Sequence, residues 1–379
     1  MKLIDPETVN DAVLDATNVA ETLAAYSAAT VYYTGQQVRD DTTHEAYESA
    51  TGAAPVTVTI TIATPGVVTQ TAHGLTNGTT VAFSTTGSLP TGLVAGTVYY
   101  IVNAATDTYE VSATSGGSSI ATSGTQSGTH SVISSPNKGN ALSDATKWID
   151  LGPTNPWGMF DRKLGTLTTN ADTIEVTLVP AGRATGMALF GLDAASVTVT
   201  VTDATDGVVF GPEEYSLSNS DNVADYYDYF FNPVIRKTEL LVEGMPLYVG
   251  PDIDVVIDNT GGTAACGNLV IGSVRELGAT IYGSGFGILD ASVKQEDDFG
   301  NIDLVERTYR STATLDVVVD RLMVDEVKRL LAARRATPTV YVGTGDYDAT
   351  LIYGFPRNWG VSITQYQQSR LTIDLESLS

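Results

Sequence analysis

Two groups of aspartates come closest to a catalytic or metal-binding arrangement. They are Asp221, Asp225 and Asp228, within an aromatic run, and Asp252, Asp254 and Asp258 further on. Two facing carboxylates can act as acid and base in glycoside hydrolysis, and clustered carboxylate oxygens can hold Ca²⁺. Neither group fits the twelve-residue calcium loop. The spacing favours turn and strand-end acids around buried aromatics, with a structural Ca²⁺ as the alternative and no other cofactor expected.

Other catalytic signatures are weak. The three histidines, His44, His73 and His130, form no His-Glu-x-x-His zinc motif. No Gly-x-Ser-x-Gly elbow marks a serine nucleophile, although a Ser-His-Asp triad has no fixed spacing in a sequence. The run Gly283–Gly287 lacks the lysine of a phosphate loop and predicts a bent strand or a bulge. We therefore expect no enzymatic activity.

The charge balance excludes some partners. The 379 residues contain 20 Lys and Arg against 44 Asp and Glu, a formal net charge of −24. Such a chain repels nucleic-acid phosphates, and no segment approaches the roughly 20 apolar residues that cross a membrane. We expect neither nucleic-acid binding nor membrane insertion.

Period-two patterns dominate the chain and predict an all-β, multi-domain protein. Apolar and polar residues alternate in Val56–Ile62, Thr173–Leu178 and Ser196–Thr202. One helix is expected at 323–336, because Val324, Val327, Leu330 and Leu331 form an apolar stripe with acids in the first turn and Arg334 and Arg335 in the last. It lies between predicted strands at Thr312–Val319 and Thr339–Val342. A short helix near Asp5–Ala16 and an extended N-terminal arm are equally compatible with the start of the chain.

Residues 56–134 stand out by composition. They contain no Lys or Arg, are rich in Thr, Ser and Gly, and divide into five to seven short strand patterns. Val81, Phe83, Val98, Tyr100 and Val102 are expected to alternate on one face, which a flexible linker would not require. We interpret the segment as an inserted β-barrel.

The sequence on both sides of this insert resembles one small module cut in two. The matching pattern comprises Ala25–Val38, Ala46–Ser49 and Asn137–Gly152, and it resembles carbohydrate-binding modules of the five/twelve type. In that family exposed aromatics stack on sugar faces, and Tyr26, Tyr33, Tyr47 and Trp148 fall on matching positions. The resemblance implies glycan binding by these four residues. The alternative interpretation is that they form the core of a three-stranded module.

The insert resembles the barrel-shaped FCCH-type repeats of viral structural proteins, through His73–Val81, Gly96–Val102 and Asp107–Val111. The remaining chain is similar to tailed-bacteriophage virion proteins. The segments that carry this second resemblance are Trp148–Asp161, Asp225–Pro233, Cys266–Gly272, Asp297–Gly300 and Arg329–Pro338. It implies a tail-associated part of the virion, made in the host cytoplasm.

These observations predict five parts. They are an N-terminal arm at 1–19, a split carbohydrate-binding-like module at 20–55 and 135–155, the barrel at 56–134, a jelly-roll-like β-sandwich at 156–285, and a C-terminal β-rich assembly unit with one helix at 286–379. Strand alternation would place Tyr227, Tyr229 and Phe231 on one face, either in a subunit interface or in a wide sandwich core. Lys328, Arg334 and Arg335 are expected to face acidic surfaces of neighbouring copies.

The leading hypothesis is a non-enzymatic structural component of a bacteriophage tail. It would assemble with itself and with other tail proteins, in a ring, a connector or a fibre attachment. The first alternative is a receptor-recognition protein that binds a host cell-surface glycan. The second is a polysaccharide depolymerase, with a carboxylate pair in the Asp221–Asp228 region.

Overall fold

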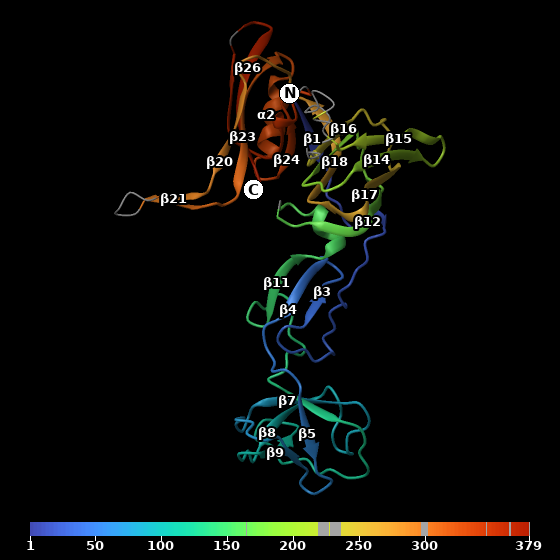
Figure 1. Cartoon of the computed structure of the whole chain (residues 1–379), viewed down its shortest axis with the longest axis vertical. Coiled ribbons are helices and arrows are strands. Elements are labelled where there is room, and N and C mark those ends of the chain that lie inside the picture. The colour runs from blue at the N-terminus through green and yellow to red at the C-terminus, as the bar shows by residue number, and fades with distance from the viewer. Residues whose placement is uncertain are drawn as a thin grey trace. The chain divides into compact units, whose positions relative to one another are not determined.

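The computed structural model describes residues 1–163, 165–218, 227, 236–296, 302–345, 347–363 and 365–378. It confirms an all-β, multi-domain architecture (Figure 1). The chain divides into two compact units. We call residues 1–21 and 155–379 the sandwich unit and residues 22–154 the barrel unit.

The insert in the barrel unit is a closed six-stranded barrel with strand order β10-β5-β6-β9-β8-β7. Its strands are β5 (Val56–Ile60), β6 (Val67–Thr69), β7 (Thr80–Thr85), β8 (Val98–Val102), β9 (Thr108–Ser112) and β10 (His130–Ser134). Closure leaves no strand edge unpaired. Val81 and Phe83 fill the interior as predicted, but β8 points Tyr99 and Ile101 inward. Val98, Tyr100 and Val102 do alternate with these buried residues but lie on the other face, because both faces of this strand are apolar and the pattern has no unique phase.

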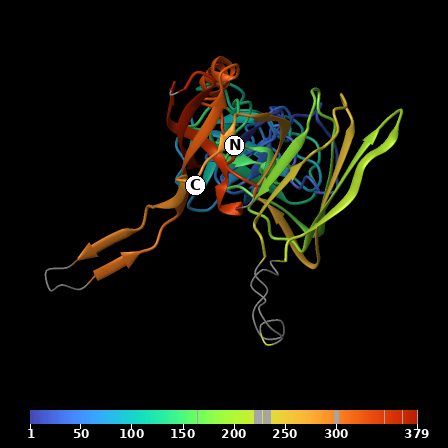
Figure 2. The same cartoon turned by 90° about the horizontal axis from the view of Figure 1, so that it is seen from above.

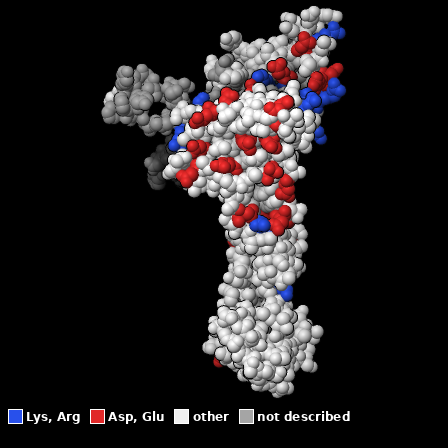
Figure 3. All heavy atoms as spheres, turned by 90° about the vertical axis from the view of Figure 1, so that its right-hand side faces the viewer, with Lys and Arg blue, Asp and Glu red and all other residues white. Residues whose placement is uncertain are grey.

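The outside of the barrel is almost uncharged. Asp107 and Glu110 are the only charged side chains in residues 56–134. On the side seen in Figure 3, the barrel shows hardly any red or blue atoms.

A three-stranded sheet is assembled from sequence on both sides of the barrel. Its order is β11 (Trp148–Pro153), β4 (Glu45–Ser49) and β3 (Gln37–Arg39). This confirms the split β module with an inserted barrel.

The sandwich unit contains a ten-stranded and a five-stranded sheet. The larger has the order β16-β13-β18-β1-β24-β25-β26-β23-β19, with β20 also pairing with β23. Its strands are β1 (Lys2–Pro6), β13 (Gly186–Phe190), β16 (Glu239–Glu243), β18 (Asn268–Glu276), β19 (Ala279–Thr280), β20 (Gly285–Asp290), β23 (Tyr309–Asp320), β24 (Thr339–Val342), β25 (Leu351–Ser362) and β26 (Gln368–Ser377). The smaller sheet comprises, in order, β15 (Gly207–Ser216), β14 (Ser196–Asp203), β17 (Asp252–Cys266), β12 (Thr168–Leu178) and β2 (Leu14–Thr17). A separate pair joins β21 (Val293–Glu296) and β22 (Ile302–Val305).

Three apolar cores hold this unit together, and the third gathers Ile4, Ala188, Phe190, Val340 and Tyr353 of the larger sheet. In the first, alternating residues of β12, β14 and β17 meet residues of β13 and β18, so the two sheets form a β-sandwich. In the second, the helix α2 (Val324–Ala333) lays Val327 and Leu331 on Leu315, Val317 and neighbouring residues of the larger sheet. Short 3₁₀ turns, η1 (Asn155–Phe160) and η2 (Asp348–Thr350), complete the described elements.

Two expected boundaries differ from the structure. The N-terminal segment is not an arm or a helix: β1 pairs with both β18 and β24, and Leu3 and Ile4 are fully buried. The division at 285/286 falls inside β20 and cuts through the larger sheet, since β13 and β18 are joined to β24 and β26 through β1. Both differences arise from pairings between segments more than 260 residues apart, which local patterns do not encode.

Candidate functional site

The aromatic residues that resemble a sugar-binding face lie in the core of the three-stranded module. Trp148 is only 2% exposed and packs with Tyr32 and Val38. The rings of Tyr26 and Trp148 are 5.6 Å apart and perpendicular, and those of Tyr32 and Trp148 are 5.3 Å apart at 70°. Edge-to-face packing of this kind stabilises small cores. These rings therefore do not present a flat exposed surface on which a sugar could stack.

Polar groups of the same residues are also occupied. Tyr26 Oη and Trp148 Nε1 donate to the carbonyl oxygen of Asn140, at 2.7 and 3.2 Å. The buried Asn137 side chain donates to Ser49 Oγ and to the carbonyl of Lys147, each at 3.0 Å. These bonds join the parts of the module that the barrel separates in sequence.

Tyr33 and Tyr47 are half-buried rather than displayed. Tyr33 lies against Gly52, where a Cβ atom would come within 2.8 Å of Tyr33 Cα. Tyr47 Oη donates to Glu45 at 2.9 Å, and burial, followed by this carboxylate, raises the pKa of Tyr47 to about 12. The structure thus supports the core interpretation for Tyr26 and Trp148, and the prediction of an exposed aromatic face was wrong for Trp148.

The aspartates of the second acidic group point away from the sandwich core along β17. Asp254 accepts a hydrogen bond from Thr177 at 2.7 Å, and Asp258 accepts one from Thr260 at 2.6 Å. The bond from Thr260 lowers the pKa of the Asp258 carboxyl. Over the described residues, no three metal-ligating side chains form a group. Asp221, Asp225 and Asp228 lie outside the described residues, and the calcium hypothesis stays a prediction.

The residues expected at an assembly interface differ in whether they are described, exposed or paired within the chain. Tyr229 and Phe231 lie outside the described residues, whereas Tyr227 is 66% exposed and helical, not in a strand. Lys328 and Arg335 are exposed on and just after α2. Arg334 instead forms an ion pair with Asp5 of β1, with both side chains mostly buried. Arg334 is thus paired within its own chain, a contact that the sequence does not show, and its assignment to an interface stays a prediction.

A ribbon that the sequence did not predict carries an exposed apolar face. We use the name ribbon for residues 285–296 and 302–314, which comprise β20, β21, β22 and the first half of β23. Figure 2 shows it projecting from the body of the sandwich unit. Phe286 and Ile288 are 62% and 64% exposed, and Leu304 and Tyr309 are similarly open.

The strand register shows that this face continues the core. Phe286 is opposite Ala313, and Ile288 is opposite Ser311, so these residues share a face of the β20–β23 pair. Further along β23 the same face bears Leu315 and Val317, which α2 covers. Within the described residues, this apolar face therefore extends past the part of the sheet that α2 covers.

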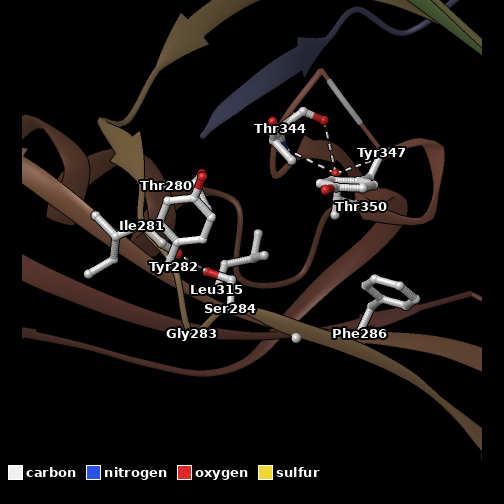
Figure 4. A pocket seen from close by; sticks show the side chains of 11 residues that line it. Thr280, Ile281, Tyr282, Gly283, Ser284, Phe286, Leu315, Thr344, Tyr347 and Thr350 are labelled. Atoms are coloured by element: carbon white, nitrogen blue, oxygen red, sulfur yellow. Dashed lines mark hydrogen bonds between the residues drawn. The ribbon is translucent and has the colours of Figure 1, made fainter.

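A cavity of about 600 Å³ lies at the root of the ribbon, where the cover ends. Leu315 and Phe286 line it, and the rings of Tyr282, Phe286 and Tyr347 stand around it (Figure 4). The run Gly283–Gly287 was expected to bend: Gly283, at φ +103°, lies in the turn that leads into β20, and the remaining glycines belong to the start of that strand. The signal for the ribbon was the alternation of glycine and apolar residues after this turn.

Comparisons with known proteins found no relative from which a function could be inferred. No family model, no curated protein and no solved structure matches the chain. No described helix has the length and apolar character needed to cross a membrane.

Proposed function

We propose that the chain is a non-enzymatic structural component of a bacteriophage tail that assembles with copies of itself and with other virion proteins. The resemblance of its segments to tailed-phage virion proteins supports the setting. The main observation in favour of self-assembly is the uncovered apolar face of the ribbon. A ring, a connector and a fibre attachment are the roles that such contacts would serve.

The ribbon is poorly stabilised by its own chain. A two-stranded ribbon is marginally stable alone in water, and β21 pairs only with β22 among the described strands. Contiguous exposed apolar residues of this kind typically mark protein interfaces. Packing against another subunit would bury Phe286, Ile288 and Tyr309 and give the ribbon the cover that α2 gives the rest of the face.

Sedimentation velocity of the full chain over a range of micromolar concentrations tests this proposal. The variant Phe286→Asp with Ile288→Asp places charges on the ribbon face, and Leu247→Asp places one on an exposed apolar residue elsewhere. We expect wild type and Leu247→Asp to form oligomers, and the ribbon variant to remain a folded monomer. A wild type that stays monomeric, or a ribbon variant that assembles as wild type does, would contradict the proposal.

The glycan-binding alternative receives no support from the module, since Trp148 is buried and the Tyr26 hydroxyl is engaged by backbone. The carboxylates considered for a depolymerase lie outside the described residues. Neither alternative is favoured by a described contact.

A further inference from the structure

The cavity at the root of the ribbon, which we call the root cavity, gathers aromatic rings that are open to water. Leu315 lines it from the buried side and is only 1% exposed. Tyr282 precedes the ribbon and is fully exposed, and Tyr347 lies between β24 and η2 and is 63% exposed. Phe286 of the ribbon adds a third ring (Figure 4). Three rings around one recess are a larger exposed aromatic surface than scattered single residues provide.

Hydrogen bonds fix the segments that carry the two tyrosines. Thr350, which is 6% exposed, directs its Oγ1 hydroxyl at the carbonyl of Tyr347 at 2.8 Å (Figure 4). Two residues after Tyr282, Ser284 Oγ accepts a hydrogen bond from Asp316 N of β23 at 3.0 Å. Both tyrosines are therefore held at their backbone before a ligand arrives, which lowers the entropic cost of binding.

The hydroxyls of these tyrosines are available to a ligand. Neither Tyr282 Oη nor Tyr347 Oη has a hydrogen-bond partner among the described residues. Each ring thus offers an apolar face and a free hydroxyl at its edge. A pyranose ring has the matching form, with C–H groups on its faces and hydroxyls around its rim. A hydrocarbon chain could not pair with the hydroxyls, and it would gain more from an enclosed pocket than from rings that stay in water.

The charge of the molecule favours a neutral sugar. The chain carries a net charge of −24, and the described lining of the root cavity offers no Lys or Arg to an acidic sugar. Asp346 and Asp348 share the loop of Tyr347, and their side chains lie outside the described residues. A carboxylate accepts hydrogen bonds from sugar hydroxyls, so acids on this loop are compatible with a neutral sugar and would repel an acidic one.

We propose that the root cavity binds a neutral oligosaccharide, with sugar rings stacked on Tyr282 and Tyr347 and sugar hydroxyls bonded to the two phenols. The cavity volume of about 600 Å³ lies in the range of small-molecule sites. This binding goes beyond the proposed structural role and is independent of it, because neither tyrosine belongs to the ribbon. In a tail protein, such a site would hold a polysaccharide of a cell surface.

Binding of the full chain to an array of defined neutral and acidic oligosaccharides tests this proposal. We expect neutral oligosaccharides to bind. The neutral oligosaccharide with the strongest signal is then titrated into each variant in a calorimeter. Tyr282→Ala and Tyr347→Ala should each weaken binding by about tenfold or more, whereas Tyr366→Ala, which removes a comparably exposed ring elsewhere, should change the affinity by less than about twofold.

Conservative variants separate stacking from hydrogen bonding. Tyr282→Phe and Tyr347→Phe keep the rings and remove the hydroxyls, so binding should fall less than in the alanine variants. Both side chains are exposed, so the variants are expected to fold as wild type does.

Three results would overturn the proposal: no binding to any neutral oligosaccharide, binding to acidic ones alone, or equal affinity of wild type and both alanine variants. Sedimentation of the alanine variants reports on self-assembly separately, and we expect wild-type behaviour. Failure of sugar binding would leave the proposed assembly role intact, whereas loss of assembly in these variants would contradict the independence of the two sites.

Discussion

Tyr26 and Trp148 share one acceptor: the tyrosine hydroxyl and the indole N–H both donate to the carbonyl oxygen of Asn140. Asn140 follows the barrel in sequence, whereas Tyr26 precedes it. The two aromatics therefore close the module around the insertion point. Their type and spacing resemble a sugar-binding face, but their packing is that of a core.

Truncating Trp148 tests this structural role. We expect Trp148→Ala to destabilise the module by about 3–5 kcal/mol, as removal of a buried aromatic does. Tyr26→Phe should cost only about 1 kcal/mol, because Trp148 still satisfies the Asn140 carbonyl. Hydrogen exchange of β3, β4 and β11 in the full chain measures both. Unchanged protection in Trp148→Ala, together with loss of binding to chitooligosaccharide, would restore the sugar-face interpretation.

Arg334 differs from the other cations near the end of α2. We expect Arg334→Glu to destabilise the sandwich unit by about 2 kcal/mol, because two carboxylates would face each other across a mostly buried contact. Lys328→Glu and Arg335→Glu should change stability by less than about 0.5 kcal/mol. Thermal unfolding of the three variants checks this.

A charge swap provides the control for Arg334. The double variant Asp5→Arg with Arg334→Glu should recover part of the lost stability. No recovery, or equal effects of all three single reversals, would show that the ion pair with Asp5 contributes nothing.

The ion pair between Asp316 and Arg370 predicts that the folded state loses stability at acid pH. Hydrogen bonds from Arg370, at 2.5 and 3.2 Å, and from Thr372 hold the pKa of Asp316 below its ordinary value. The unfolded chain therefore takes up this proton first as pH falls. The stabilisation is complete above about pH 4 and is lost as pH falls through the lower, folded pKa.

Because Arg370 is half exposed, the contribution is about 1 kcal/mol. Asp316→Asn should lose that stability at pH 7 and little at pH 2, whereas Glu326→Gln, on the exposed side of α2, should follow wild type. Denaturant titrations at both pH values measure the difference. An Asp316→Asn deficit that is equal at the two pH values would contradict the assignment.

The barrel is expected to be removable. Ala53 N donates to the carbonyl of Ser134 at 2.9 Å, so the two chain crossings between barrel and module lie side by side. Deleting residues 56–134 and joining the ends with a short Gly/Ser linker should leave a soluble, assembling protein with β3, β4 and β11 paired. Circular dichroism and light scattering check this, and a wholly insoluble deletion variant would count against an autonomous insert.

Local patterns predicted elements well where one side of an element is buried. The apolar stripe from Val324 to Leu331 located α2, and Thr339–Val342 has the bounds of β24. Period two located β8 but left its inward face open, because Val98–Val102 is apolar on both faces and barrel closure decides which face is buried.

The pairing of strands that are far apart in the chain could not be predicted from local sequence patterns. Nothing near Lys2–Pro6 indicates that this strand separates β18 from β24, and hence that Asp5 meets Arg334. The candidate interface was missed for the same reason, since Phe286 is recognisable as uncovered only when it is known which strand residues α2 packs on.

The most direct test of the central claim is a cryo-EM map of the virion that contains this chain. We expect several copies in the tail, with the Phe286 and Ile288 face of each copy covered by a neighbouring subunit. A tail that lacks the chain, or copies whose ribbon faces remain open to solvent, would contradict it.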